Sequence, residues 1–373
     1  MLPPAADRPK LRSTLDQLSA AVEDLLLGGL TTASEATRQT LAGAMQEAAR
    51  MRLLRLGGTL RVATEELGRY TREDKNFSRR RLTFFLNRAW LLSRGMVHSL
   101  DTGDEKEYDR LTWSPPSQPL PAVEVVNLGT VKKVAEGAFV MFEFRLRAVA
   151  DADPIKAGQR ISWSAVFPLK KGQDIPPEGF LHLPQKQKFA PFLFLERNTL
   201  AVTNATVSGD ESGGWRLALT DQSTVTSGKP FTGWDRFLQW TPAAAVERIA
   251  KHTPGPLDLD TELQEEIVLR GYDIGKPEDG DEPGQTVFPV TSGPVAFHAV
   301  VGAGLEGKAL KAALEDVRKA KSPNPPLFGV MHYERCRLVF QPLTTFDGSP
   351  NYITISKENV NKAALLKAMN FTG

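Results

Sequence analysis

The sequence predicts a multidomain α+β protein with an N-terminal helical bundle, a central antiparallel β-barrel or sandwich, and a C-terminal α+β module. Apolar residues recur every three or four positions in the first hundred residues, as on one face of a helix. After a proline-rich stretch the apolar period changes to two, which indicates half-buried strands. We expect a helical bundle over 1–100, a linker over 101–121, a β-barrel or sandwich over 122–240, a helical pair over 241–272, an acidic loop over 273–286 and an α+β module over 287–373.

The first hundred residues are expected to form four helices. One apolar stripe ends before the glycines at 28–29, which favour a helix stop, and Thr31, Thr32 and Ser34 are candidate N-caps of the second helix. The glycines at 57–58 predict a break or a kink in the third helix, and a fourth helix is expected over 77–96. Short connections between four helices indicate an antiparallel bundle. The stripes contain Leu11, Leu15, Leu18, Val22, Leu25, Leu41, Met45, Ala48, Met51, Leu53, Leu56, Leu60, Ala63, Leu67 and Tyr70.

Strands with alternating faces are expected beyond the linker. In 138–149, apolar residues such as Phe142 and Phe144 alternate with polar ones such as Arg145, and 159–167 alternates in the same way. Many short strands at regular spacing indicate a small antiparallel barrel or sandwich. Further strands are expected at 123–128, 191–195, 199–207 and 215–220.

The C-terminal third is expected to mix helices and strands. Thr241 and Pro242 predict the start of a helix through Lys251, and Thr261 with Gln264 resembles a capping box for a second helix. A stretch rich in Asp, Glu, Gly and Pro then predicts a loop. The remaining elements are expected to be a strand at 295–301, a helix at 305–321, one or two strands in 327–343, a strand at 352–355 and a helix at 356–371.

The composition excludes several classes of protein. The 373 residues are 41% hydrophobic and 24% charged, as in ordinary globular proteins. A single cysteine, Cys336, leaves no intramolecular disulfide, and five scattered histidines favour neither a metal site nor a cofactor. No apolar run is long enough to span a membrane, and the N-terminus lacks the pattern of a signal peptide. We therefore expect a cytoplasmic protein, and these patterns do not set its oligomeric state.

Two charge blocks oppose each other within a net charge of +2. Residues 50–94 carry eleven Arg and one Lys against four acidic residues, and residues 256–282 carry ten acidic residues against one Arg and one Lys. Such blocks are typical of a polyanion site and an acidic interaction segment. The alternative is two solvated faces that attract each other within the chain or between subunits.

The arginines near residue 80 are the candidate binding site. A run of three arginines at 79–81 precedes aromatic residues within 84–90, and this combines positive charge with rings as phosphate-contacting surfaces do. The alternative places the rings in the core of the bundle and the arginines on its exposed face. The candidate binding residues are Arg79, Arg80, Arg81 and Arg88.

No group of residues in the sequence predicts catalysis. Residues 302–307 match G-x-G-x-x-G between a predicted strand and a predicted helix, but too few residues follow Glu334 to complete a dinucleotide-binding sheet. His332 and Cys336 would share one face of a strand at about twice the ~6–7 Å spacing of same-face neighbours, so they cannot hydrogen-bond directly. We predict that the protein is not an enzyme. The alternative is a reactive Cys336 assisted by a distant histidine.

The N-terminal pattern resembles a group of bacterial proteins. Residues 24–30 (DLLLGGL), followed by Leu41, 46–48 (QEA) and 53–56 (LLRL), are similar to the helical region of bacterial proteins associated with SWIM zinc-finger and MoxR/von Willebrand-type ATPase gene clusters. The resemblance covers about a fifth of the chain. The sequence has no zinc-finger cysteine set and no P-loop. The resemblance therefore implies an accessory component rather than the ATPase or the metal-binding partner.

These patterns predict a non-catalytic adaptor subunit of a bacterial cytoplasmic assembly that contacts a protein partner through its charged surfaces. The alternative function is nucleic-acid binding through the Arg-rich helices and the β-barrel, because small barrels bind single strands. Neither hypothesis involves a cofactor, a metal or a membrane.

Overall fold

The computed structural model describes residues 2–74, 77–112, 117–135, 139–169, 176–209, 213–239, 242–251, 264–281, 283–320, 323–334 and 337–356. They form two compact units, one within Met1–Pro115 and one within Pro116–Thr253 and Leu259–Gly373. The first unit is helical and the second contains the sheets, so the predicted change from N-terminal helices to a mixed α+β chain is confirmed. None of the described helices combines the length and the hydropathy that a membrane-spanning helix needs.

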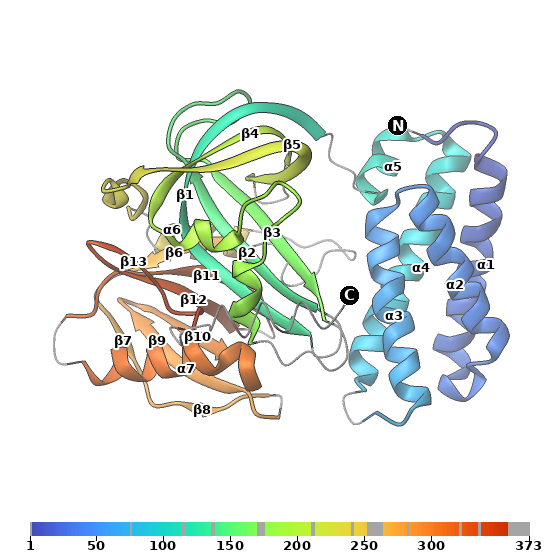
Figure 1. The fold of residues 1–373 in the computed structure, drawn as a ribbon. Coiled ribbons are helices and arrows are strands. Elements are labelled where there is room, and N and C mark those ends of the chain that lie inside the picture. Colours follow the sequence, from blue (N-terminus) through green and yellow to red (C-terminus); the bar gives the residue numbers. More distant parts are fainter. Residues whose placement is uncertain are drawn as a thin grey trace, which may run out of the picture. The chain divides into compact units, whose positions relative to one another are not determined.

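The described part of the helical unit contains α1 (Arg8–Gly28), η1 (Leu30–Thr32), α2 (Glu35–Arg50), α3 (Leu54–Thr71), α4 (Arg79–Thr102) and α5 (Glu105–Thr112). α1 packs on α2 and α4, and α3 packs on the same two helices, so the four long helices lie alongside one another (Figure 1). Leucines at the predicted stripe positions fill the core between them. Leu18, Leu41, Leu60 and Leu92 are completely buried.

Polar caps and glycines set the ends of these helices. Ser34 Oγ accepts a hydrogen bond from the Thr37 amide at 3.1 Å, as an N-cap does. Gly29 follows α1 at a φ of 77°, in the region that favours glycine. The predicted break at 57–58 is wrong, because α3 runs through both glycines and the chain turns before it, at Arg52 with a φ of 55°.

The stretch expected to be a linker contains a helix. α5 forms within 101–121 because Tyr108 and Leu111 are buried in the bundle core, where they add apolar contact to the end of α4. Glu105 and Asp109, two of the acidic residues within the predicted linker, lie on the exposed side of this short helix.

The second unit begins with five strands, β1 (Ser117–Ala135), β2 (Phe139–Ala148), β3 (Arg160–Pro168), β4 (Asn198–Gly209) and β5 (Trp215–Pro230). Their order β1-β2-β3-β5-β4 closes into a barrel, because β1 pairs antiparallel with both β2 and β4 (Figure 1). The seam between β3 and β5 is short and parallel. It pairs Ile161 with Trp215 and Ser162 with Arg216.

Aromatic side chains fill the interior of these five strands. Phe144, Trp163 and Phe194 lie with their ring centroids between 4.7 and 5.3 Å apart, and all three are buried. The strand predicted at 191–195 is wrong: this segment is the 3-10 helix η3 (Pro191–Leu195). Pro191 begins the helix, and the turn directs Phe194 into the aromatic core. Two other short helices in this unit are η2 (Pro177–His182) and η4 (Trp234–Phe237).

A mixed sheet follows, with the order β6-β11-β12-β10-β9-β7; β13 pairs with β12, and β8 with β9. Leu310 and Leu314 of α7 pack into the hydrophobic core on one face of this sheet. Within the sheet, β10 and β12 pair in parallel. The elements are α6 (Pro242–Lys251), β6 (Glu265–Leu269), β7 (Tyr272–Ile274), β8 (Glu278–Asp279), β9 (Thr286–Ser292), β10 (Val295–Val301), α7 (Gly304–Lys319), β11 (Leu327–Glu334), β12 (Arg337–Asp347) and β13 (Ser349–Tyr352).

Several predictions for this region need correction. The second helix of the pair expected over 241–272 is wrong: the described part of that segment is β6, a strand buried on both faces and therefore without an alternating pattern. The acidic loop expected over 273–286 contains parts of β7 and β9 and all of β8, and β7 and β8 pair with β9. The strand expected at 352–355 lies at Ser349–Tyr352. Most of the helix expected over 356–371 falls outside the described residues.

The barrel and the mixed sheet of this unit share a small apolar core. Val126, Leu128 and Val131 on β1 contact Phe328 and Leu343 of the mixed sheet. Gly129 lies at an irregularity in the β1–β2 pairing, and a Cβ there would come within 2.8 Å of the Phe328 ring and 2.9 Å of the Leu343 Cβ. The absence of a side chain at residue 129 therefore permits the close approach.

We expect Gly129→Ala to destabilise the second unit by about 1–3 kcal/mol, the usual cost of overpacking a core. The measurement is urea unfolding of the full chain followed by tryptophan fluorescence. Gly209→Ala is the control, because a Cβ at Gly209 meets nothing within 4 Å in the same unit. If Gly129→Ala and Gly209→Ala unfolded at the same urea concentration, a side chain at residue 129 would not interfere with Phe328 and Leu343.

Candidate functional site

The predicted arginine site divides into exposed and buried residues. Arg79 and Arg80 are exposed at the start of α4. Arg81 is exposed as well, but its Nε lies 3.8 Å from a carboxylate oxygen of the buried Glu66. Arg88 is only 5% exposed. Arg88 lies one helical turn before the buried Leu92, on the inward side of α4, so it does not share the exposed surface of Arg79 and Arg80.

The acidic segment 256–282 is partly internal. Glu265 and Glu266 begin β6, and both are buried. The expectation that these two glutamates lie on a helix and contribute to an acidic surface is wrong, because arginines of the same unit surround them. The carboxylates of 256–282 that fall in 256–263 and at 282 are outside the described residues.

The outward side chains of the barrel form a basic face, defined as Lys133, Arg145, Arg147, Arg160 and Arg216. Arg147 on β2 lies directly opposite Arg160 on β3. Two residues before Arg147 on β2, Arg145 lies opposite Ser162 on β3. Ser162 in turn lies opposite Arg216 on β5. Paired residues on neighbouring strands point to the same side of a sheet. Three strands therefore present cations on one outer surface.

Glu266 compensates the like charges of Arg147 and Arg160, which would otherwise repel each other across the strands. Its carboxylate accepts a hydrogen bond from Arg147 Nη2 and lies 3.8 Å from Arg145 Nη1. Burial acts to raise the pKa of Glu266, but the positive charges of Arg147, Arg145 and Arg160 together hold this pKa below its usual value. Glu266 is therefore a carboxylate anion at neutral pH.

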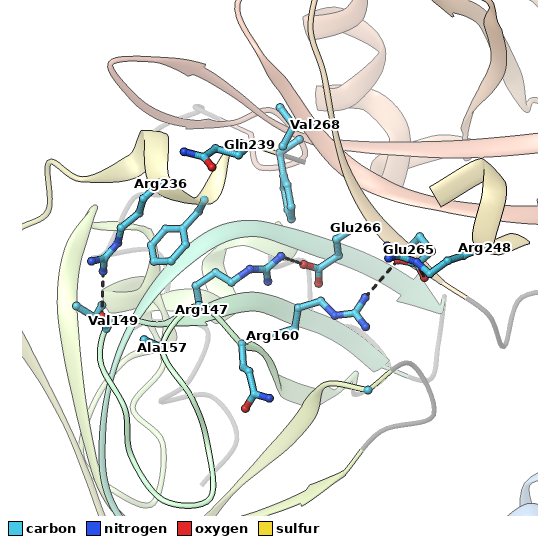
Figure 2. A pocket seen from close by; sticks show the side chains of 15 residues that line it. Arg147, Val149, Ala157, Arg160, Arg236, Gln239, Arg248, Glu265, Glu266 and Val268 are labelled. Carbon is cyan, nitrogen blue, oxygen red and sulfur yellow. Dashed lines mark hydrogen bonds and ion pairs between the residues drawn. The ribbon is translucent and has the colours of Figure 1, made fainter. Parts of the chain in front are cut away.

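Glu265 binds the neighbouring arginines on the other side of β6. Arg248 on α6 donates from Nε and Nη2 to its two carboxylate oxygens, both at 2.9 Å, in a fork arrangement. Arg160 Nη1 lies 3.8 Å from the same carboxylate. Figure 2 shows Arg147 and Arg160 extending from the barrel toward Glu266 and Glu265.

A cavity of about 690 Å³ opens beside these ion pairs, and we call it the arginine cavity. Arg147, Arg160, Arg236 and Arg248 line it together with Glu265 and Glu266, so its charged side chains have a surplus of two positive charges (Figure 2). The remaining lining residues are Val149, Ala157, Gly158, Gln159, Gly213, Phe237, Gln239, Val268 and Phe328.

A second cavity, of about 820 Å³, lies over the short seam between β3 and β5, and we call it the barrel cleft. Its lining includes the cations Lys133, Arg145, Lys186 and Arg216 and a single carboxylate, Glu143. Glu143 pairs with Arg145 at 2.5 Å. Lys133 and Lys186 are exposed, and neither has an ion-pair partner among the described residues.

The sequence analysis placed these strand residues outward but did not group them as a site. The available signal was the pair of arginines at 145 and 147 two residues apart on one strand face, with Arg160 beginning the next strand. The partners could not be found from sequence, because Glu265 and Glu266 lie more than a hundred residues away in the chain.

The described residues offer no group of three or more His, Cys, Asp or Glu side chains that could hold a metal ion. The hypothesis of a reactive Cys336 falls outside the described residues. In the glycine-rich segment 302–307, residues 302–303 connect β10 to α7, and residues 304–307 form the first turn of α7. There the carbonyl oxygen of Gly302 would lie 1.9 Å from a Cβ on Gly307, so the glycine serves tight local packing.

No family model and no curated protein matches this sequence. Among solved structures, the chain is similar to a tetrameric p202 HIN2 domain at 11% identity and a TM-score of 0.29, over 65% of this chain and 97% of that one. It is similar to a murine DNA binding protein bound with double-stranded DNA at 12% identity and a TM-score of 0.26, over 65% and 100% of the two chains. A Replication Protein A heterotrimer bound to single-stranded DNA matches at 9% identity and a TM-score of 0.28, over 69% and 53%. TM-scores this low do not define a shared fold.

We expect Glu266→Gln to lower the free energy of unfolding by about 3 kcal/mol near neutral pH, because it leaves the half-buried arginines around it without their counterion. The folded-state pKa of Glu266 is below its ordinary value of 4.5, so its contribution is complete above that value and is lost as the pH falls through the folded pKa. The difference between wild type and variant should therefore shrink in acid. Urea unfolding at several pH values measures it.

The matched control is Glu278→Gln, which removes an exposed carboxylate of β8 from the same unit. This variant should unfold with the wild type across the whole pH range. A Glu266→Gln protein as stable as the control at neutral pH would show that the arginines do not depend on this carboxylate.

Proposed function

We propose that this protein binds single-stranded nucleic acid on the basic face of the barrel, in the barrel cleft. The surplus of cations there supports the proposal most directly: Lys133, Arg145, Lys186 and Arg216 line the cleft against one carboxylate, Glu143. A strand of nucleic acid carries one negative charge per nucleotide, and neutralising its phosphates with lysines and arginines provides most of the nonspecific affinity.

The arrangement of these cations suits an extended polyanion. Arg145 and Arg216 are separated by one strand, which places their backbones about 10 Å apart. Lys133 on β1 lies opposite Met141, which precedes Arg145 on β2 by two residues of the same strand face. The positive charges therefore extend along β2 as well as across the neighbouring strands. A groove lined along its length by cations can track a nucleic-acid backbone.

Apolar side chains lie beside the cations and supply contacts for bases. Val166 is 56% exposed on the outer surface of β3, opposite Met141, and Ala218 on β5 borders the same cleft. Closed five-stranded barrels of the OB type bind oligonucleotides on the surface of their second and third strands. Here β2 and β3 carry the basic face, which supports the same use by architectural analogy.

We expect Lys133→Ala/Lys186→Ala to weaken binding of a fluorescent single-stranded oligonucleotide by roughly 20-fold at about 0.1 M NaCl, since each lost phosphate contact removes ~0.7 from the slope of log affinity against log salt. The slope itself should fall by about 1.4. Fluorescence anisotropy titrations over a range of salt concentrations measure both quantities.

The control is Arg79→Ala/Arg80→Ala, which removes two exposed positive charges from the helical unit. It should retain the wild-type salt slope. The opposite result, with the helical variant weakened and the lysine variant intact, would assign binding to α4. An absence of binding by the wild type at low salt would exclude the function.

The second proposed function is an adaptor subunit that contacts a protein partner through the helical unit. Leu27 at the end of α1 and Leu54 at the start of α3 are 82% and 60% exposed, the two highest values among the exposed large apolar side chains of the described residues. An adaptor role is also what the resemblance of residues 24–30 and 53–56 implies. Under this hypothesis the two leucines contribute to the contact with the partner.

We expect a tagged wild-type protein to retain a stoichiometric protein partner after nuclease treatment if it is an adaptor, and Leu27→Ser/Leu54→Ser to lose that partner. Val166→Ser, which alters an exposed apolar residue of the other unit, is the control and should keep it. Quantitative mass spectrometry of proteins recovered at low salt is the measurement. Partners that disappear with nuclease would contradict the adaptor hypothesis.

A further inference from the structure

The arginine cavity is distinct from the barrel cleft and has the composition of a site for a compact dianion. Its charged lining consists of four arginines and two glutamates. The glutamates are already engaged: Glu266 with Arg147, and Glu265 with Arg248 and Arg160. A surplus of two positive charges remains, and a phosphate monoester carries a charge of about −1.5 to −2 at neutral pH.

Arg236 is the residue of this cavity that is placed to receive such an anion. It is exposed at the rim, and no carboxylate in the described ranges pairs with it. Its Nη2 donates to the Val149 carbonyl at 3.2 Å (Figure 2). Its guanidinium lies 4.6 Å from the centroid of the Phe237 ring. These two contacts orient the guanidinium while leaving further N–H donors for a phosphate.

Phe237 and two amides complete the lining that a nucleoside needs. The half-buried Phe237 ring borders the cavity and offers a surface on which a base can stack. Gln159 accepts hydrogen bonds at its Oε1 from the Lys156 amide and from Trp215 Nε1, which orients its side chain and leaves its NH₂ group to donate. Gln239 adds an exposed amide at the rim. A volume of about 690 Å³ is within the usual range of small-molecule sites.

We propose that the arginine cavity binds a nucleoside phosphate monoester, with Arg236 contacting the phosphate and Phe237 stacking on the base. Its source is the phosphorylated end of a bound strand or a free mononucleotide. Binding of the phosphorylated end of a nucleic-acid strand rests on the proposed function, whereas binding of a free mononucleotide does not. The two cavities meet on the same strands: Arg147 and Arg160 face the arginine cavity, and the next row along β2 and β3, Arg145 and Ser162, faces the barrel cleft. A strand in the cleft can therefore place its end in the cavity.

The test compares internally labelled oligonucleotides of one sequence that carry a 5′-phosphate, a 3′-phosphate or only hydroxyl ends. We expect one phosphorylated form to bind about tenfold tighter than the hydroxyl form, as a charge-assisted hydrogen bond to an arginine provides. Arg236→Ala should reduce this advantage to less than about twofold, and Arg236→Lys should restore only part of it because lysine lacks the planar fork.

Arg270→Ala is the matched control. Arg270 is an exposed arginine of the same unit that also donates to a backbone carbonyl, that of Leu238 at 3.5 Å, but it does not line the cavity. It should keep the full phosphate advantage. If Arg236→Ala and Arg270→Ala weakened the preference for the phosphorylated oligonucleotide equally, the preference would arise from the overall positive charge of the unit. That result would overturn the assignment of Arg236.

Titration with thymidine monophosphate alone separates the two sources. Binding of the mononucleotide that Arg236→Ala abolishes, without any advantage for phosphorylated strand ends, assigns the cavity to a free nucleotide. Equal affinity for all three oligonucleotides together with no mononucleotide binding overturns the proposal. The hydroxyl-ended oligonucleotide reports the proposed function separately, because its affinity depends on the barrel cleft and not on Arg236.

Discussion

Glu266 and the arginines around it join two parts of the second unit that are distant in sequence. The carboxylate begins the first strand of the mixed sheet, while Arg145, Arg147 and Arg160 belong to the barrel. Arg147 and Arg160 lie side by side on paired strands, and Glu266 offsets the repulsion between their like charges. The mixed sheet therefore contributes to the stability of the barrel, and the apolar cluster around Gly129 packs the two together.

This internal anion also limits where an external anion can bind. Around β6 the carboxylates of Glu265 and Glu266 have already taken the positions that phosphates would occupy next to Arg147, Arg160 and Arg248. Each cavity also contains cations that pair with neither of these glutamates: Lys133 and Lys186 in the barrel cleft, and Arg236 in the arginine cavity. Both proposed sites thus border the same buried ion-pair cluster, and a polyanion bound across them competes with the glutamates for shared arginines.

The sequence predicted the parts of this structure that depend on local pattern. The leucine stripes of the four helices and the alternation of Phe142 and Phe144 with charged neighbours follow directly from the period of a helix or a strand. β6 could not be predicted, because burial on both faces removes any alternation and Thr261 with Gln264 imitates a helix start. The cluster of arginines and glutamates could not be predicted for a different reason. Charge runs such as 79–81 are visible in a sequence, whereas arginines and glutamates from β2, β3, α6 and β6 become a cluster only through folding.

The strict alternation of β2 has a consequence for how this surface can vary. Between Phe139 and Ala148 every second side chain is buried, and the intervening ones, including Glu143, Arg145 and Arg147, face outward. Substituting an outward residue alters the charge pattern and leaves the aromatic interior untouched. Inserting or deleting one residue would exchange the two sets and place arginines in the core. Outward positions of β2 that do not pair with a buried carboxylate can therefore change by point substitution, whereas a change in strand length disrupts the packing of the barrel.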